Sequence, residues 1–270
     1  MTKAHNANSY PIIFSDFDGT ITQTDVTDEI LTELAHPSWR EVEQEWVRGA
    51  IGSRECLRRQ MALVDASSEE LETLIDSILL DPHFSAFLCF AHQAGAPFYV
   101  VSDGFDYVIR RVLKRAGLSG ELRNGSHLFS SVLHVEGRRT VATFPHPACE
   151  HGCATCKPEV IRHVARELRG GANGERRPVV FIGDGFSDRF AVEEADIVFA
   201  KGQLLEYCGE RGVASHAFET FADVERELRR LIGAPAPHAS ESSEPRANGR
   251  KRAPASSPSP RDTSEKGATP

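Results

Sequence analysis

Short apolar runs alternate with helical patterns along most of the chain. Residues 11–14, 98–101, 179–182 and 197–199 are almost wholly apolar, which is typical of strands buried on both faces. Helical spacing of apolar residues predicts helices between and after these strands, at residues 84–93, 105–116, 158–168, 190–194 and 221–232. Strands that alternate with helices predict an α/β fold, in which a parallel sheet is covered on both faces.

One stretch departs from this alternation. From Asp25 to about Leu80 the apolar residues recur at helical spacing with no strand between them. We interpret residues 25–81 as a small helical cap inserted into a core formed by residues 10–24 and 82–233. Residues 132–135 and 140–144 predict a hairpin within that core, and the Pro-, Ser- and Arg-rich residues 234–270 predict a disordered tail.

Each of three predicted strands ends in a polar group that could carry chemistry. Asp16 and Asp18 follow the first strand, Ser102 ends the second, and Asp184 follows the third. Because ligands of an open parallel sheet bind at the carboxyl ends of its strands, we expect these groups to converge. A lone Asp-x-Asp is usually a solvated loop, and it is the convergence that favours a functional site.

These residue types suit phosphate chemistry that uses a hard cation. Magnesium prefers carboxylate oxygens, which Asp16 and Asp184 could supply from adjacent strands. A carboxylate can attack phosphorus and form an acyl-phosphate, and Asp18 could then act as general acid and base. Thr20 and Ser102 could donate to phosphate oxygens, although Ser102 could equally cap the next helix. Lys157, at the start of a predicted helix, could balance the negative charge.

Four segments, in this order, resemble the motifs of the haloacid dehalogenase superfamily of phosphatases. They are Asp16-Phe17-Asp18-Gly19-Thr20, Ser102 in Val-Val-Ser-Asp-Gly-Phe, Lys157, and Gly183-Asp184-Gly185-Phe186-Ser187-Asp188. The resemblance extends over roughly residues 10–232. It implies a Rossmann-like core, with a helical cap after the first motif.

The same resemblance implies a set of residue roles. Asp16 would be the nucleophile and Asp18 the acid and base. Magnesium would be held by Asp16, by the main-chain carbonyl of Asp18 and by Asp184, with Asp188 in support. The implied partner is a small phosphorylated metabolite.

Two groups of this superfamily compete for the resemblance. Residues 97–102, together with the three cysteines before Lys157-Pro158, are similar to the methionine-salvage phosphatases that act on 2-hydroxy-3-keto-5-methylthiopentenyl-1-phosphate. The alternative is phosphoserine phosphatase, in which a glutamate and an arginine of the cap grip the amino acid. Those two positions fall here on Asp25 and Gln60, and loss of the arginine favours a substrate without an amino-acid carboxylate. The candidate substrate-binding residues are Thr20, Asp25, Gln60, Asp103 and Gly104.

Cys149, Cys153 and Cys156 form a cluster directly before Lys157, and His146 and His151 lie nearby in the sequence. Three thiolates and an imidazole, with His146 the first candidate, could make a closed tetrahedral zinc site. Packed free thiols and an oxidisable pair are the alternatives, and the spacing alone does not choose among them. A catalytically silent fold that binds metal or a partner through this loop is the non-enzymatic hypothesis.

Composition and charge narrow the class of protein. The 270 residues carry a formal net charge of −8 and six cysteines, half of them in the cluster. An acidic body disfavours nucleic acid as a partner. No apolar run is long enough to span a bilayer, and the polar first nine residues lack a signal-peptide core. We therefore expect a cytoplasmic enzyme with no membrane partner, and a homodimer is compatible with the sequence.

Overall fold

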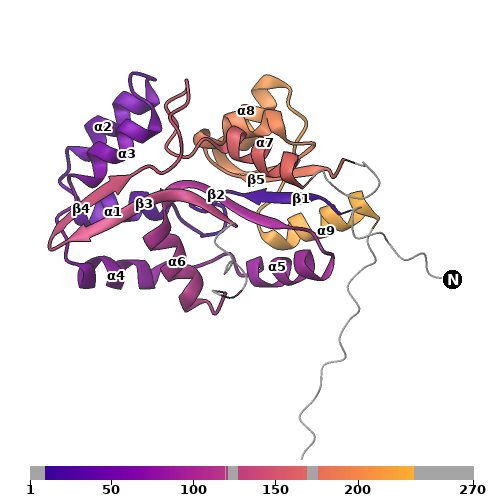
Figure 1. Ribbon diagram of the computed structural model, residues 1–270, viewed down its shortest axis with the longest axis horizontal. Coiled ribbons are helices and arrows are strands. Elements are labelled where there is room, and N and C mark those ends of the chain that lie inside the picture. The colour runs from indigo at the N-terminus through magenta and orange to yellow at the C-terminus, as the bar shows by residue number, and fades with distance from the viewer. Residues whose placement is uncertain (1–9, 119, 121–126, 169–175, 234–270) are drawn as a thin grey trace, which may run out of the picture. The chain divides into compact units, whose positions relative to one another are not determined.

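The fold is built on one seven-stranded sheet. The computed structural model describes residues 10–118, 120, 127–168 and 176–233 (Figure 1). The strand order is β4-β3-β2-β1-β5-β6-β7. All neighbouring strands run parallel except β3 and β4, which form an antiparallel hairpin. The strands are β1 (Ile12–Ser15), β2 (Phe98–Phe105), β3 (Leu128–Glu136), β4 (Arg139–Thr143), β5 (Val179–Gly183), β6 (Ile197–Ala200) and β7 (His216–Ala217).

Helices cover both faces of this sheet. In Figure 1, α7 and α8 lie on one side of the central strands, and α5, α6 and α9 lie on the other. These helices are α5 (Phe84–Gln93), α6 (Asp106–Arg115), α7 (Lys157–Glu167), α8 (Gly202–Arg211) and α9 (Phe221–Ile232). The α/β class and the Rossmann-like arrangement predicted from the sequence are thereby confirmed.

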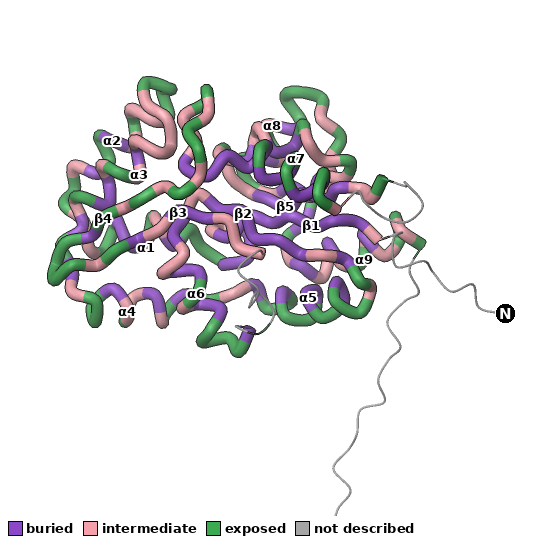
Figure 2. The backbone as a smooth tube through the Cα atoms, in the orientation of Figure 1, coloured by how far each residue is buried: buried purple, intermediate pink, exposed green. Residues whose placement is uncertain are grey.

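Strand β1 shows why the central strands read as continuous apolar runs. Ile13 packs into the apolar cluster on the α5, α6 and α9 side, whereas Ile12 and Phe14 pack into the cluster on the α7 and α8 side. Successive side chains of a strand point to opposite faces, and here both faces are buried (Figure 2). The centre of the sheet is therefore a rigid base for the polar residues at its carboxyl edge.

Four helices fill the stretch between β1 and α5. They are α1 (Val26–Leu34), α2 (Trp39–Val47), α3 (Ser53–Met61) and α4 (Ser68–Ser77). Helix α2 packs on α3, and α3 packs on β4, while α4 packs on α1 and α6. Most of their buried apolar residues belong to the cluster on the α5, α6 and α9 side of the sheet, so the helical stretch shares a hydrophobic core with the strands.

Several boundaries differ from those expected. Strand β2 continues to Phe105 and β3 begins at Leu128, where it pairs in parallel with β2 before it turns into the hairpin. The helix expected at residues 190–194 is a longer 3-10 helix, η2 (Phe186–Glu194), and α8 and β7 were not predicted. The tail at 234–270 lies outside the described residues. Among the helices of the described residues, none is both long and apolar enough to cross a membrane.

Candidate active site

The turn after β1 brings Asp16 to the carboxyl edge of the sheet. The Asp16 N–H donates to the Ile182 carbonyl of the neighbouring strand β5, over 2.9 Å. Gly19 adopts a positive φ of 69°, and a Cβ there would sit 2.4 Å from Oδ2 of Asp184. The chain can therefore curl this tightly between Asp16 and Asp184 only because residue 19 has no side chain.

Lys157 supplies the positive charge of the site. Its ammonium lies 2.9 Å from Oδ2 of Asp16 and 2.5 Å from Oδ1 of Asp188, and all three side chains are almost completely buried. Burial lowers the pKa of Lys157, but Asp16 and Asp188 outweigh burial, so that its pKa lies above the ordinary lysine value. The amine is therefore charged at neutral pH.

Asp188 is fully occupied by neighbours. Its Oδ1 accepts from Lys157, and its Oδ2 accepts from the backbone N–H groups of Asp184 and Gly185, each over 3.1 Å. These bonds fix the loop that carries Asp184 and hold the Lys157 ammonium in place. Asp188 thus lies behind the site, in contact with Lys157 and the Asp184 loop, and its support of the metal site stays a prediction.

Asp18 and Ser102 face each other across the site. The Ser102 hydroxyl lies 3.4 Å from Oδ2 of Asp18 and accepts from the Gly104 N–H over 2.9 Å. Burial first, and the charge of Asp25 second, raise the pKa of Asp18 well above its ordinary value. A raised pKa favours the protonated carboxyl group, which is the form that a general acid needs.

Asp184 is held by a hydroxyl. Thr20 is buried, and its Oγ1 donates to Oδ1 of Asp184 over 2.5 Å. From the sequence we expect the Thr20 hydroxyl to donate to a phosphate oxygen. In the structure it donates instead to Asp184 and orients that carboxylate. Burial and the charge of Asp188 raise the pKa of Asp184 to about 6.

The carboxylates are too many for the cations beside them. Oxygens of Asp16, Asp184 and Asp188 lie within 4.8 Å of one another, and the pKa of Asp16 is raised first by burial and then by Asp188. Asp188 accepts three hydrogen bonds, more than Asp16 or Asp184 does, so these two have more lone pairs left for a metal ion. A hard divalent cation suits this donor set, because it would relieve the repulsion between the two carboxylates.

A cavity of about 120 Å³ opens onto these groups. Asp16, Asp18, Ser102 and Asp184 line its floor, while side chains from α2 and α3 form part of its wall. Among the residues that line it there is no arginine or lysine. The lining residues are Asp16, Asp18, Asp25, Thr27, Asp28, Glu43, Trp46, Ser53, Cys56, Leu57, Gln60, Ser102, Asp103, Gly104, Asp184, Gly185 and Ser187.

The predicted substrate-binding residues divide into two groups. Asp25, Gln60, Asp103 and Gly104 line the cavity, whereas Thr20 does not. Gln60 is buried and its Nε2 donates to Oε2 of Glu43 over 2.8 Å. The position at which phosphoserine phosphatases would carry an arginine thus holds a neutral amide that already has a carboxylate partner.

The Asp103 carboxylate is held by hydrogen bonds at the edge of the cavity. Its Oδ1 accepts from the Thr155 N–H over 2.8 Å, and it also bonds with the Ser53 side chain. The carboxylate therefore ties the loop before Lys157 to the edge of the sheet. These donors and the Lys157 ammonium offset the negative charge directly after Ser102.

The residues of the cavity wall were not predicted from the sequence, and the histidine beside the cysteines differs from the one predicted. Glu43, Trp46 and Leu57 lie on ordinary amphipathic helices, where no pattern distinguishes them from surface residues. In the loop before α7, the side chain grouped with Cys149 and Cys153 is that of His151. His146, the histidine named from the sequence, lies instead against the Phe129 ring.

Comparisons with known proteins find similar sequences over most of the chain. The sequence profile of the haloacid dehalogenase-like hydrolases matches residues 13–193. The 2-hydroxy-3-keto-5-methylthiopentenyl-1-phosphate phosphatase of Geobacillus thermodenitrificans is 31% identical over 228 residues, which cover 82% of this chain and 96% of that relative. The bifunctional enzyme MtnB/MtnX of Bacillus licheniformis is 31% identical over 223 residues, or 81% of this chain and 49% of that relative.

Solved structures show likeness in fold. A phosphoserine phosphatase, solved as a phospho-aspartyl intermediate analogue, aligns with a TM-score of 0.61 at 22% identity and covers 83% of this chain and 99% of its own. A hydrolase of Salmonella enterica serovar Typhi aligns with a TM-score of 0.62 at 19% identity, over 86% of this chain and 73% of its own. At such identities the likeness concerns the fold alone.

Proposed function

The chain belongs to the haloacid dehalogenase-like hydrolases, and on this premise we propose that it is a magnesium-dependent phosphatase that forms an aspartyl-phosphate on Asp16. The observation that carries the proposal is the contact between Asp16 and Lys157 at the cavity floor. The Lys157 ammonium opposes the burial and the Asp188 charge that raise the pKa of Asp16, and it thereby favours the ionised form that a nucleophile requires. Magnesium, when bound by Asp16 and Asp184, would neutralise phosphate charge.

The chain's own residues would carry out the chemistry in two steps. An Asp16 oxygen attacks phosphorus, the ester P–O bond breaks, and Asp18 gives its proton to the leaving oxygen. Asp18, now a carboxylate, takes a proton from water, and the water oxygen attacks the phosphoryl group. Inorganic phosphate leaves and Asp16 returns to a free carboxylate. The Lys157 ammonium stays bound to Asp16 and Asp188 throughout, and Ser102 orients Asp18.

The substrate that we propose is 2-hydroxy-3-keto-5-methylthiopentenyl-1-phosphate. Relatives with that name match most of this chain. The cavity wall supports the assignment, because Trp46, Cys56 and Leu57 offer an apolar surface that suits a methylthio group. Phosphoserine is less well accommodated, because no basic side chain lines the cavity to pair with its carboxylate.

The acidic side chains of the wall favour a second candidate class. Asp25, Asp28 and Glu43 line the cavity together with the Trp46 ring. Carboxylates beside an aromatic ring are suited to an ammonium or quaternary ammonium group. Phosphoethanolamine and phosphocholine are therefore the candidates to set against the methylthiopentenyl compound. In either case, residues 25–81 would act as the cap that selects the substrate.

Phosphate release across a substrate panel tests both parts of the proposal. The panel contains the methylthiopentenyl phosphate, phosphoserine, phosphoethanolamine, phosphocholine and pyridoxal phosphate, each assayed with magnesium and with chelator. We expect the highest kcat/KM for the methylthiopentenyl compound and loss of turnover on chelation. Preference for an amine ester would replace the substrate and keep the mechanism, whereas silence across the panel would contradict the phosphatase assignment.

A further inference from the structure

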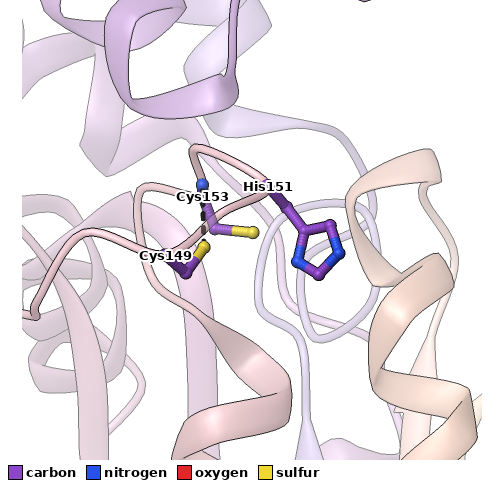
Figure 3. Close-up of side chains that lie close together, drawn as sticks. All are labelled: Cys149, His151 and Cys153. Carbon is purple, nitrogen blue, oxygen red and sulfur yellow. Dashed lines mark hydrogen bonds between the residues drawn. The ribbon is translucent and has the colours of Figure 1, made fainter.

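The loop between β4 and α7 carries a second group of metal-ligating side chains. The Sγ atoms of Cys149 and Cys153 and a ring nitrogen of His151 lie within 4.8 Å of one another. Figure 3 shows the two sulfurs side by side on this loop, with the imidazole of His151 next to them. Cys156 adds a third thiol, because its side chain hydrogen-bonds with that of Cys149. We propose that Cys149, His151, Cys153 and Cys156 bind one structural zinc ion.

The donor set suits zinc better than other common metals. Three sulfurs and one imidazole make the closed tetrahedral shell that structural zinc sites use. Magnesium and calcium prefer oxygen ligands, whereas the side chains grouped here offer sulfur and nitrogen, with the Glu150 carboxylate 3.8 Å from Nε2 of His151. The cluster is therefore chemically distinct from the carboxylate site at the sheet edge.

Backbone N–H groups already point at the sulfur atoms. The Cys153 N–H donates to Sγ of Cys149 over 3.4 Å, and the His151 N–H donates to the same sulfur. The Glu159 N–H, in the first turn of α7, donates to Sγ of Cys156. Donors of this kind stabilise thiolates, which are the form of cysteine that binds metal.

A surface cleft gives an ion access to the loop, and an aromatic ring holds the histidine in place. A surface cleft of about 1030 Å³ lies along the loop and is lined by Cys149, His151 and Cys156. The His151 ring stacks on Phe190 of η2, with centroids 4.1 Å apart. This stacking keeps the imidazole beside the sulfurs, whereas His146 lies against Phe129.

A bound ion would brace two parts of the catalytic machinery. Lys157 directly follows Cys156, so fixing the loop fixes the start of the helix that carries this lysine. The loop also holds the beginning of α3, where Arg54 N–H donates to the Gly152 carbonyl and the Ala154 N–H donates to the Ser53 hydroxyl. Gly52 and Gly152 approach so closely that a Cβ on Gly52 would meet the Gly152 carbonyl oxygen at 2.5 Å. The zinc would thus be structural and would join the loop to the cavity wall.

Zinc content of the purified full-length chain is the test. We expect about one zinc per chain in wild type, and the same in Cys89→Ser, a cysteine exposed on α5 and remote from the loop. Asp184→Asn should keep that zinc, which distinguishes the cluster from the carboxylate site. Cys149→Ser and Cys153→Ser should lose it. The cobalt form should show thiolate-to-cobalt charge-transfer absorption that disappears in the same two variants.

A further variant covers the case in which a cysteine variant does not fold. His151 is exposed, so His151→Ala should fold and should release zinc faster to a colorimetric chelator than wild type does. Three results would overturn the proposal: wild type without zinc, zinc content unchanged in Cys149→Ser and Cys153→Ser, or a thiol count two lower than six because a disulfide joins the cluster. None of these readouts depends on phosphatase activity.

Discussion

The Lys157 ammonium lies 2.9 Å from the Asp16 carboxylate at the carboxyl edge of the sheet. Both side chains are nearly inaccessible to water, and the same ammonium binds Asp188 on its other side. A buried charge is costly unless it is paired, so neither partner can be removed without consequences for the other. The stability and the chemistry of the site therefore depend on the same contact.

Replacing Lys157 by methionine should destabilise the protein. Lys157→Met keeps most of the side-chain volume but leaves Asp16 and Asp188 without their cation. Removing one partner of a buried pair costs about 3–5 kcal/mol, and we expect a loss of that order in denaturant unfolding at neutral pH. Lys114→Met, at an exposed position of α6, is the matched control and should change stability little. Equal stability of the two variants would contradict the pairing.

Replacing Asp16 by asparagine should abolish turnover without loss of fold. Asp16→Asn retains the shape of the side chain and removes the nucleophilic charge, and we expect kcat to fall by roughly four orders of magnitude or more. Acid quenching of the wild type during turnover of a radiolabelled substrate should leave phosphate on the protein, and the variant should carry none. Asp65→Asn, at the exposed Arg138 ion pair, serves as the control. Turnover by freshly prepared Asp16→Asn that matches the control would refute the nucleophile assignment.

The role of Asp18 can be separated from that of Asp16 by the leaving group. Asp18→Asn cannot protonate the departing oxygen, so we expect a loss of about 10²–10⁴-fold with an alkyl phosphate. With p-nitrophenyl phosphate the rate of phosphoprotein formation should fall much less, because its leaving group needs no proton. Steady-state and burst kinetics with the two substrates give the comparison. An equal loss with both would argue against a general-acid role.

Metal-free protein should become more stable as the pH falls below neutrality. The pKa of Asp184 is about 6 in the folded protein against 3.8 ordinarily, and that of Asp16 is also raised. The folded chain therefore binds protons that the unfolded chain does not, so stability is gained below the folded pKa and lost as the pH rises through it. Thermal unfolding midpoints between pH 5 and pH 7.5 should show this slope. Magnesium should flatten it, and so should Asp184→Asn, whereas Asp65→Asn should leave it unchanged.

The sequence predicts best the strands whose two faces are both buried. The runs at residues 11–14 and 179–182 are buried on both faces, so composition alone identifies them as strands. Strand β2 continues through Ser102, Asp103 and Gly104. Because these residues are not apolar, the sequence pattern does not show that the backbone there is still extended. Helix α8 was missed because only Leu204 and Cys208 are buried in it, which gives too weak an apolar pattern.

Some site residues can likewise be identified from local sequence motifs, whereas others depend on tertiary contacts. Asp16, Asp18, Lys157 and Asp184 stand in motifs next to predicted strands and helices, and the structure brings them together. The choice between His146 and His151 could not be made from spacing, because His146 shortly precedes Cys149 and His151 lies between Cys149 and Cys153. The choice depends on packing: His151 stacks on Phe190, whereas His146 lies against Phe129. Both phenylalanines are distant from the cysteines in the sequence.

Gly104 offers the sharpest test of the geometry around Asp18. A Cβ at this position would lie 2.2 Å from Oδ2 of Asp18 and 3.1 Å from the Ser102 hydroxyl, so Gly104→Ala must displace the carboxylate. Displacement of a catalytic group by about 1 Å can cost 10²-fold, and we expect a fall in kcat of that order with the fold preserved. Gly209→Ala is the matched control, because nothing lies within 4 Å of a Cβ there and the residue sits in α8. That control should keep full activity and gain about 0.5–1 kcal/mol of stability from helix propensity. Full activity in Gly104→Ala would mean that Asp18 has room to move and is not held against Ser102.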